Sequence, residues 1–182
     1  DNDDNGVNSP NPATTGIRSL PVTLEPGGEP VSDGADEDGS YDDDDSNLTV
    51  AFGFFELLSL GNQIWFDEDG NGVFDGGEPT VGAGVILYLL DGDGNPILDP
   101  VSGQPISVTT SADGIYLFTN LYPGDDRVQI GPENFESGGP LEGYASSSGN
   151  SDPDNDSEGD DNGEDTDELL LQGIMSDPVT LG

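Results

Sequence analysis

The residue types and spacing best suited to chemistry lie in one acidic loop. Residues 67–78 read D-E-D-G-N-G-V-F-D-G-G-E and match the pattern D-x-[DN]-x-[DN]-G-x5-E at every specified position. In this pattern, oxygen atoms from loop positions 1, 3, 5, 7, 9 and 12 surround a calcium ion, and the final Glu contributes both carboxylate oxygens. The candidate Ca2+ ligands are therefore Asp67, Asp69, Asn71, Val73, Asp75 and Glu78. The alternative is an acidic, glycine-rich hairpin loop that is merely solvated.

The sequence around this loop predicts strands and not helices. Residues 63–66 form a short apolar run of strand type, and Pro79 directly after Glu78 opposes a helix. We therefore expect the calcium loop to occur here without the helices that often flank it, joining segments of β-structure.

The charge of the chain points in the same direction. Asp and Glu number 39 against 2 Lys and Arg, which gives a formal net charge of −37 over 182 residues. Self-repulsion of this size opposes compaction, and bound divalent cations would offset it. The alternative is adaptation to a high-salt habitat, where the Debye length falls to about 3 Å at 1 M salt. In either case the surface should repel nucleic acids and anionic membranes, so the expected partners are cations or other proteins.

Several residue types are missing, and their absence narrows the function classes. The chain has no Cys and no His, which removes disulfides, thiol chemistry and the usual catalytic base. No apolar stretch approaches the roughly 20 residues that span a bilayer, so we expect no membrane insertion. The acidic residues crowd into glycine-rich turns and not into an aromatic-walled cleft of the glycosidase kind, so we expect no enzyme. Since the chain starts at Asp1 without Met, it is either a processed protein or a window of a longer one.

An internal repeat is the second strong signal. Residues 3–24 align with residues 160–181 at a constant offset of 157, with eleven of twenty-two positions identical. The conserved part includes the block G-I-x-S-x-P-V-T-L, which is not of low complexity. The sequence therefore predicts one unit of a tandem repeat of about 157 residues.

Period-two apolar segments separated by Gly, Pro and Asp predict an all-β protein without a convincing amphipathic helix. The predicted strands are residues 17–24, 48–55, 61–66, 84–90, 106–110, 114–119, 127–130 and 169–179, the last broken near Gly173. Residues 91–95 and 113–114 have the turn chemistry of hairpins. The predicted core between two sheets consists of Trp65, Val85, Leu87, Leu89, Tyr116, Phe118, Val128 and Ile130.

These motifs resemble a known family of surface modules. Residues 47–55, 59–91 and 110–128 are similar to the B-type repeat of serine-aspartate-repeat surface proteins and to the related collagen-adhesin B domains. The resemblance implies an immunoglobulin-like, prealbumin-type antiparallel β-sandwich in a secreted multidomain protein, stiffened by calcium at the six loop residues named above. The chain lacks the Lys needed for the isopeptide bond of the collagen-adhesin pattern. It also shows no sortase signal and no serine-aspartate tract, so wall anchoring is unsupported.

The alignment also predicts how the chain is divided. Residues 1–58 would complete one repeat, with strands near 17–24 and 48–55, and residues 59–182 would open the next. The closing strand of that second repeat would be the following copy of residues 48–55. A following repeat, a strand from a neighbouring chain, or the chain's own residues 48–55 could fill the open position.

Two acidic loops, residues 33–46 and 151–168, and the N-terminal residues are further candidates for calcium. They carry oxygen-bearing side chains at alternate positions, although none completes the twelve-residue template. The alternative is a self-repelling, disordered loop. The residues concerned are Asp1, Asp3, Asn5, Asp36, Asp38, Asp154, Asp156, Asp160 and Asn162. Of the two glycosylation sequons, at Asn47 and Asn155, we favour Asn155 because Asn47 begins a predicted strand.

Together these features predict a non-catalytic, calcium-stabilised structural repeat of an extracellular stalk or filament. Its partners would be neighbouring copies of the same repeat, stacked head to tail and joined by strand complementation. The alternative is an adhesin module that binds a host protein or carbohydrate through exposed aromatic residues, for which Phe135, Tyr144 and Tyr122 are the candidates.

Overall fold

The computed structural model describes residues 4–7, 9, 12–29, 45, 47–147, 161–165 and 169–182. They belong to two compact units, Asp1–Phe55 and Glu56–Gly182. The boundary lies within a few residues of the predicted division at residue 58. That the first unit completes one repeat and the second opens the next stays a prediction.

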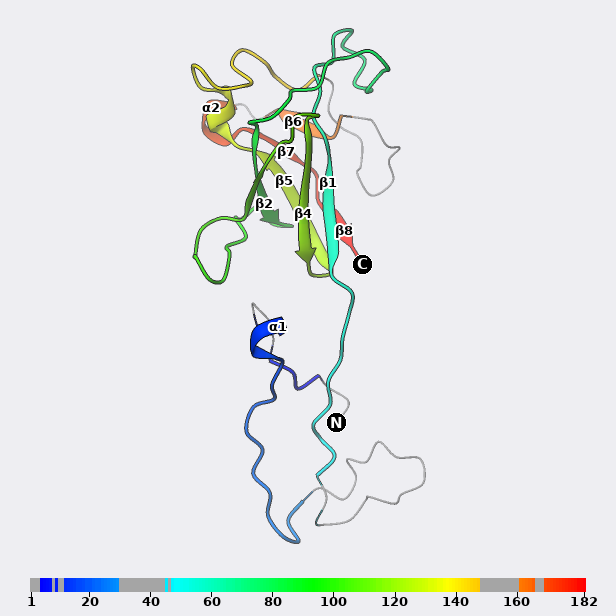
Figure 1. Ribbon diagram of the computed structural model, residues 1–182, viewed down its shortest axis with the longest axis vertical. Helices are drawn as coiled ribbons and strands as arrows, with labels where there is room; N and C mark the ends of the chain where they lie inside the picture. The colour runs from blue at the N-terminus through cyan, green and yellow to red at the C-terminus, as the bar shows by residue number, and fades with distance from the viewer. Residues whose placement is uncertain are drawn as a thin grey trace. The chain divides into compact units, whose positions relative to one another are not determined.

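The second unit is built from two antiparallel sheets (Figure 1). One contains β1 (Leu58–Gln63) and β4 (Ile115–Leu121). The other has the order β3-β2-β5-β7-β6, with β8 also pairing with β5. Its strands are β2 (Ile86–Asp91), β3 (Ser107–Thr109), β5 (Gly124–Ile130), β6 (Gly163–Asp165), β7 (Ile174–Ser176) and β8 (Val179–Leu181). The predicted immunoglobulin-like antiparallel β-sandwich is confirmed.

The core lies between the two sheets because inward-facing apolar residues alternate along the strands. Leu87 and Leu89 of β2 are each 1% exposed and pair across the sheet with Ile130 and Val128 of β5. Phe118 of β4, also 1% exposed, packs against them from the other sheet. Of the predicted core, Val85, Leu87, Leu89, Phe118 and Val128 are buried, whereas Trp65, Tyr116 and Ile130 are partly buried. Leu121, Phe135, Leu141 and Ile174 complete the buried cluster.

The first and last strands of this unit meet at one end of the sandwich. Leu58 at the start of β1 pairs with Leu121 at the end of β4. Leu181 at the end of β8 pairs with Gly124 at the start of β5. Because a short turn joins β4 to β5, the chain enters and leaves the described sandwich beside the same turn (Figure 1).

Two predicted strands are wrong. Residues 17–24 and 48–55 form no strand and make only single bridges, between Val7 and Arg18 and between Asp4 and Ala51. Their alternating pattern suits a sheet, but an isolated strand pair is marginal in water and needs further strands to pack on. Their apolar side chains consequently stay exposed, Phe54 to 77% and Leu20 to 71%.

The prediction for residues 169–179 is wrong in its first part. Leu169–Gln172 forms a short helix, α2, because three Leu and a Gln are good helix formers. Gly173, with φ of +68°, then ends the helix by donating its N–H to the carbonyl oxygen of Leu169 at 2.8 Å. The strands β7 and β8 follow. Strand β6, by contrast, forms inside the predicted acidic loop 151–168.

The internal repeat of the sequence is also a repeat of local structure. In the first unit, helix α1 (Pro12–Thr15) ends at Gly16, whose φ is also +68° and whose N–H donates to Pro12 at 2.9 Å. The bridge between Val7 and Arg18 corresponds, at the offset of 157, to the pair Glu164 and Met175 of β6 and β7. The same segment thus adopts the same local fold at both places.

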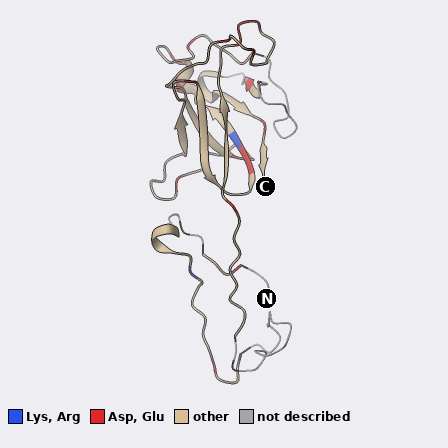
Figure 2. Cartoon of the chain, turned by 45° about the vertical axis from the view of Figure 1, so that its right-hand side comes forward, with Lys and Arg blue, Asp and Glu red and all other residues tan. Residues whose placement is uncertain are grey.

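The remaining elements are short. A 3-10 helix, η1, spans Pro132–Phe135. No helix among the described residues has the length and apolar character needed to cross a membrane. The predicted hairpin turn at Asp113-Gly114 is present, and Gly114 has φ of +74° with the carbonyl oxygen of Ile64 only 2.6 Å from where a Cβ would lie. Figure 2 shows that many of the acidic residues lie in loops and turns.

Candidate metal centre

The two segments that flank the loop of residues 67–78 pair with each other as β-structure. Trp65 forms an antiparallel bridge with Thr80, and the N–H of Phe66 donates to the carbonyl oxygen of Pro79 at 2.8 Å. No helix adjoins the loop, as predicted from Pro79 and the apolar run before it. Hydrogen bonds between the two flanking segments therefore hold the ends of the loop together.

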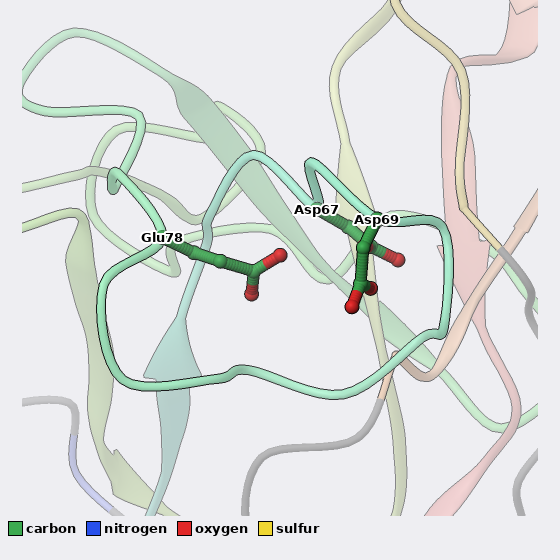
Figure 3. Close-up of side chains that lie close together, drawn as sticks. All are labelled: Asp67, Asp69 and Glu78. Carbon is green, nitrogen blue, oxygen red and sulfur yellow. The ribbon is translucent and has the colours of Figure 1, made fainter.

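Three carboxylates converge inside this loop. One oxygen atom from each of Asp67, Asp69 and Glu78 lies within 4.8 Å of the others. Figure 3 shows Glu78 extending across the loop from one side toward Asp67 and Asp69 on the other. Calcium binds oxygen ligands at 2.3–2.6 Å, so ligands on opposite sides of the ion are about 5 Å apart. The spacing therefore fits a single ion held between the three side chains.

Backbone N–H groups hold two of these carboxylates in place. Asp67 accepts from Gly70 at 2.6 Å and from Gly72 at 2.8 Å. Glu78 accepts from Glu68 at 2.9 Å with Oε1 and from Asp75 at 3.0 Å with Oε2. The loop thus positions its first and last acidic residues through its own backbone.

The same hydrogen bonds favour the ionised form of Asp67. The Gly72 N–H is the main cause that lowers the pKa of Asp67 from 3.8 to about 2, and the Ser147 hydroxyl and the Gly70 and Asn71 N–H groups add to it. Partial desolvation opposes the shift. A metal ligand must be deprotonated, and Asp67 is deprotonated at neutral pH with a wide margin.

The other three predicted ligands lie around this trio. The Asn71 side-chain amide donates to Asp69 at 3.2 Å and to Asp75 at 3.0 Å, and its oxygen accepts from the Val73 N–H at 2.7 Å. Gly72, at the sixth position, is buried and has φ of +77°, as the sharp turn of the pattern requires. The structure therefore brings Asp67, Asp69 and Glu78 together. Of the other predicted ligands, Asn71 bonds directly to Asp69, Asp75 bonds directly to Glu78, and Val73 bonds to Asn71.

Two residues outside the predicted set support the loop. Asp161 donates its backbone N–H to the carbonyl oxygen of Gly72 at 2.8 Å. Its carboxylate accepts from the Ser147 hydroxyl at 3.1 Å, and Ser147 also contributes to the lowered pKa of Asp67. Sequence spacing could not reveal this contact, because these residues are far from the loop along the chain.

The fold agrees with a comparison to known protein families. The model of the SdrD B-like domain matches residues 58–179, which is most of the chain. The chain belongs to the SdrD B-like domain family. The matched region contains the candidate metal centre and both sheets, except for the last two residues of β8.

Relatives of this SdrD B-like domain occur in large proteins. Colossin-A of Dictyostelium discoideum is 36% identical over 87 residues, which is 47% of this chain and 1% of that protein. The serine-aspartate repeat-containing protein D of Staphylococcus aureus is 34% identical over 85 residues, 46% of this chain and 6% of that protein. The chain thus spans only a small part of the curated relatives that it matches. A solved structure of BcpA, the major pilin subunit of Bacillus cereus, aligns with a TM-score of 0.30 at 14% identity, over 39% of this chain and 17% of that one.

The further calcium candidates of this SdrD B-like domain chain fall mostly outside the described residues. Of the two that are described, Asn5 uses its side-chain oxygen to accept from the Ala51 N–H at 3.0 Å, and Asn162 directly precedes β6. Outside the described residues lie Asp1, Asp3, Asp36, Asp38, Asp154, Asp156 and Asp160, together with the glycosylation candidate Asn155. Calcium binding at these positions stays a prediction.

The aromatic candidates for an adhesive surface differ in exposure. Phe135 is 4% exposed and belongs to the core, so the prediction of Phe135 as a candidate surface contact is wrong. Tyr122 and Tyr144 are about half exposed. Tyr144 also packs on Phe66, with ring centroids 4.6 Å apart. This contact gives Tyr144 a structural role beside the loop of residues 67–78, the candidate metal loop.

A cleft of about 200 Å³ opens beside the metal loop, between the two sheets of the SdrD B-like domain. Its lining is mostly apolar. The apolar lining residues include Ile64, Trp65, Tyr116, Val128 and Ile174, and the polar ones include Asp67, Ser147, Asp161 and Asn162. The loop of residues 67–78 and the cleft therefore share Asp67, and Asp161, which hydrogen-bonds to Gly72 of the loop, also lines the cleft.

Proposed function

We propose that this chain is a non-catalytic, calcium-stabilised structural repeat of an extracellular stalk or filament. The observation that carries the proposal is the convergence of Asp67, Asp69 and Glu78 in a loop closed between strands. Calcium in this loop would stabilise the fold without moving a helix, because both segments that flank the loop belong to the β-sandwich and neither is a helix.

The charge of the chain supports a structural role for the ion. Three carboxylates within 4.8 Å repel one another in a chain of net charge −37. A divalent cation between them would replace this repulsion by attraction. It would also hold the paired ends of the loop, the Gly72 turn and the hydrogen bond from Asp161 to Gly72 in one arrangement. The ion would therefore stiffen the side of the sandwich where the loop lies.

The repeat supports a linear assembly. The segment before and within β7 occurs twice, at an offset of 157, with the same helix, the same left-handed Gly and the same bridge. Repeats in which each unit contacts only its neighbours form quasi-one-dimensional stalks or filaments. We propose that neighbouring copies stack head to tail, with a strand from one copy completing a sheet of the next.

Thermal unfolding of the full chain tests the role of calcium. The midpoint is measured with excess CaCl2 and with chelator, at an ionic strength matched with NaCl. A ligand that binds only the folded state at about 100 times its Kd contributes roughly 2.7 kcal/mol, so a rise of several degrees specific to calcium is expected. An equal rise with NaCl alone would mean that general screening stabilises the acidic chain, and the calcium proposal would fail.

A matched pair of variants makes this test specific to the loop. Glu78→Gln removes one of the three converging carboxylates, whereas Glu136→Gln removes one negative charge at an exposed position after η1. The calcium-dependent rise should shrink in Glu78→Gln and persist in Glu136→Gln. Equal rises in both variants would place the stabilising ion elsewhere.

A further inference from the structure

The cleft between the sheets lies beside an incomplete sheet. Within the described residues, β1 pairs with β4 alone, so this sheet has two strands against six in the other. The cleft lining runs from Asn62 of β1 to Gly163 of β6 and Ile174 of β7. An edge strand is a template for pairing with an added strand, and an apolar cleft beside it offers pockets for alternate side chains.

A segment of the first unit has the character of a strand without a sheet. Residues 47–55 read N-L-T-V-A-F-G-F-F and carry no ionisable side chain, in a chain with a net charge of −37. Val50, Phe52 and Phe54 lie on one face of an extended chain and are 39%, 45% and 77% exposed. An uncharged segment is the part of such a chain that can approach a second copy with the least repulsion.

The first unit shows how this segment docks. The N–H of Asn5 donates to the carbonyl oxygen of Ala51 at 3.0 Å, and the N–H of Ala51 donates back to the Asn5 side-chain oxygen at 3.0 Å. Gly53 adds a bond to the Asp4 carboxylate at 3.3 Å. The Phe52 ring lies against Gly6, whose Cβ, if present, would be 3.3 Å from Phe52 Cδ1. Residues 51–53 thus contact residues 4–6 through backbone and side chain.

Residues 4–6 are the internal copy of residues 161–163. Both triplets read Asp-Asn-Gly, and in both the first Asp accepts from the Gly N–H, at 2.8 Å in Asp4–Gly6 and 2.9 Å in Asp161–Gly163. A Cβ on either Gly would meet the matching Ile, Ile17 or Ile174. Residues 161–163 line the cleft. The first unit therefore already shows residues 51–53 docked on residues 4–6, which are a copy of the cleft-lining residues 161–163.

Trp65 supplies an independent sign of an absent neighbour. It lines the cleft, and among the described residues its indole Nε1 is buried without a hydrogen-bond acceptor. A buried N–H left without an acceptor is destabilising. The backbone of an added strand brings carbonyl oxygens, which are acceptors of the kind that this N–H lacks.

From these observations we propose that the cleft of one copy receives residues 47–55 of a second copy as an added strand. Ala51 of the incoming strand meets Asn162, as it meets Asn5 in the first unit, and Phe52 enters the cleft beside Gly163. This inference rests on the head-to-tail stacking of the proposed function and names both the donor segment and its acceptor.

Disulfide trapping in the full chain tests the pairing, and the absence of Cys from the chain makes the background clean. Ala51→Cys and Asn162→Cys are combined in one chain, oxidised, and separated by size under non-reducing conditions. Most of the protein should form a ladder of disulfide-linked multimers that a reductant dissolves. The matched control combines Ala51→Cys with Val101→Cys, a loop position that is 81% exposed.

A peptide titration avoids any dependence on the cysteine variants. A full chain with Phe52→Asp lacks a competent donor segment but retains the cleft, because Phe52 lies outside the Glu56–Gly182 unit. A peptide of residues 47–55 contains no Trp, so the fluorescence of Trp65, the single Trp of the chain, reports its binding. We expect a saturable blue shift with this peptide and at least a tenfold weaker response with the same peptide carrying Phe52→Asp.

Each outcome bears on one proposal. A monomer with an internal disulfide would show that the chain closes its own cleft and would overturn the inference, as would equal ladders in the Val101→Cys control. A ladder that forms equally in calcium and in chelator supports strand addition but removes calcium from the assembly. A calcium-specific thermal rise without a ladder or peptide binding leaves the calcium role standing and overturns strand addition.

Discussion

The backbone N–H of Asp161 donates to the carbonyl oxygen of Gly72 at 2.8 Å. This bond joins the Gly72 turn of the loop of residues 67–78 to a residue that lies two positions before β6 and lines the cleft. An ion bound by Asp67, Asp69 and Glu78 would therefore act on the same structure that we propose receives a strand from a second copy.

Glu78→Gln should weaken calcium binding at the loop at least tenfold, which corresponds to about 1.4 kcal/mol. The amide keeps one oxygen but loses the charge and the second carboxylate oxygen that close the site. Isothermal titration of the full chain measures the change. Glu136→Gln serves as the charge-matched control, and unchanged affinity in Glu78→Gln would remove Glu78 from the site.

The carboxylate of Asp67 should titrate near pH 2 in chelator. Its folded pKa is lowered from 3.8 to about 2, chiefly by the Gly72 N–H, so its contribution to stability is present above about pH 4. That contribution is lost as the pH falls through about 2, because folding then no longer favours the ionised form. Carboxylate NMR measures the midpoint, and Asp67→Asn should remove the signal. A midpoint near 3.8 would contradict the hydrogen-bonded geometry.

Asp126→Asn should stabilise the domain at neutral pH. Burial is the main cause that raises the pKa of Asp126, and the charges of Asp125 and Asp91 add to it. A raised pKa means that folding disfavours the ionised carboxylate, so the amide should raise the unfolding midpoint by about 2 °C at pH 7.

The pH dependence of that gain provides its own check. The gain should vanish at a pH below 3.8, where Asp126 is protonated in both the folded and the unfolded chain. Asp113→Asn, an exposed turn residue, is the matched control and should show no comparable gain. A loss of stability in Asp126→Asn at pH 7 would show that its carboxylate makes a favourable contact.

Gly173→Ala should destabilise the Glu56–Gly182 unit by more than about 2 kcal/mol. Gly173 has φ of +68°, which alone disfavours Ala by about 1–2 kcal/mol, and a Cβ there would lie 2.0 Å from the carbonyl oxygen of Ile130. Gly16 has the same φ with nothing within 4 Å of a Cβ, so Gly16→Ala isolates the backbone strain from the clash. Chemical denaturation compares the two, and equal losses would mean that the clash is relieved at no cost.

The local signals of the sequence predicted the core well, and calcium binding by the loop of residues 67–78 stays a prediction. Residues 67–78 carry their ligand spacing within twelve positions, and the alternation of Leu87 and Leu89 or of Val128 and Ile130 is a property of single strands. Neither requires knowledge of distant residues. The convergence of Asp67, Asp69 and Glu78 follows from the same local pattern.

The sequence was less informative where the structure depends on a partner. Residues 48–55 have a strand pattern, yet they form no strand here because a strand needs a sheet to join. Asp161 and Ser147 contact the metal loop through folding of the whole domain, and no spacing within the loop reveals them. The helix at Leu169–Gln172 reflects Leu-rich propensity that an apolar run shares with a buried strand.

The two points at which the chain enters and leaves the sandwich affect how the sandwich responds to force. Leu58 and Leu181 both lie beside the turn between β4 and β5. Tension applied through these two points pulls β1 from β4 and β8 from β5 starting at one end, so their hydrogen bonds break in succession and not together. A module loaded in this way would unfold at lower force than one whose hydrogen bonds are all loaded at once. A strand that runs the length of the cleft and continues into a neighbour would move the load to the opposite end and convert peeling into shear.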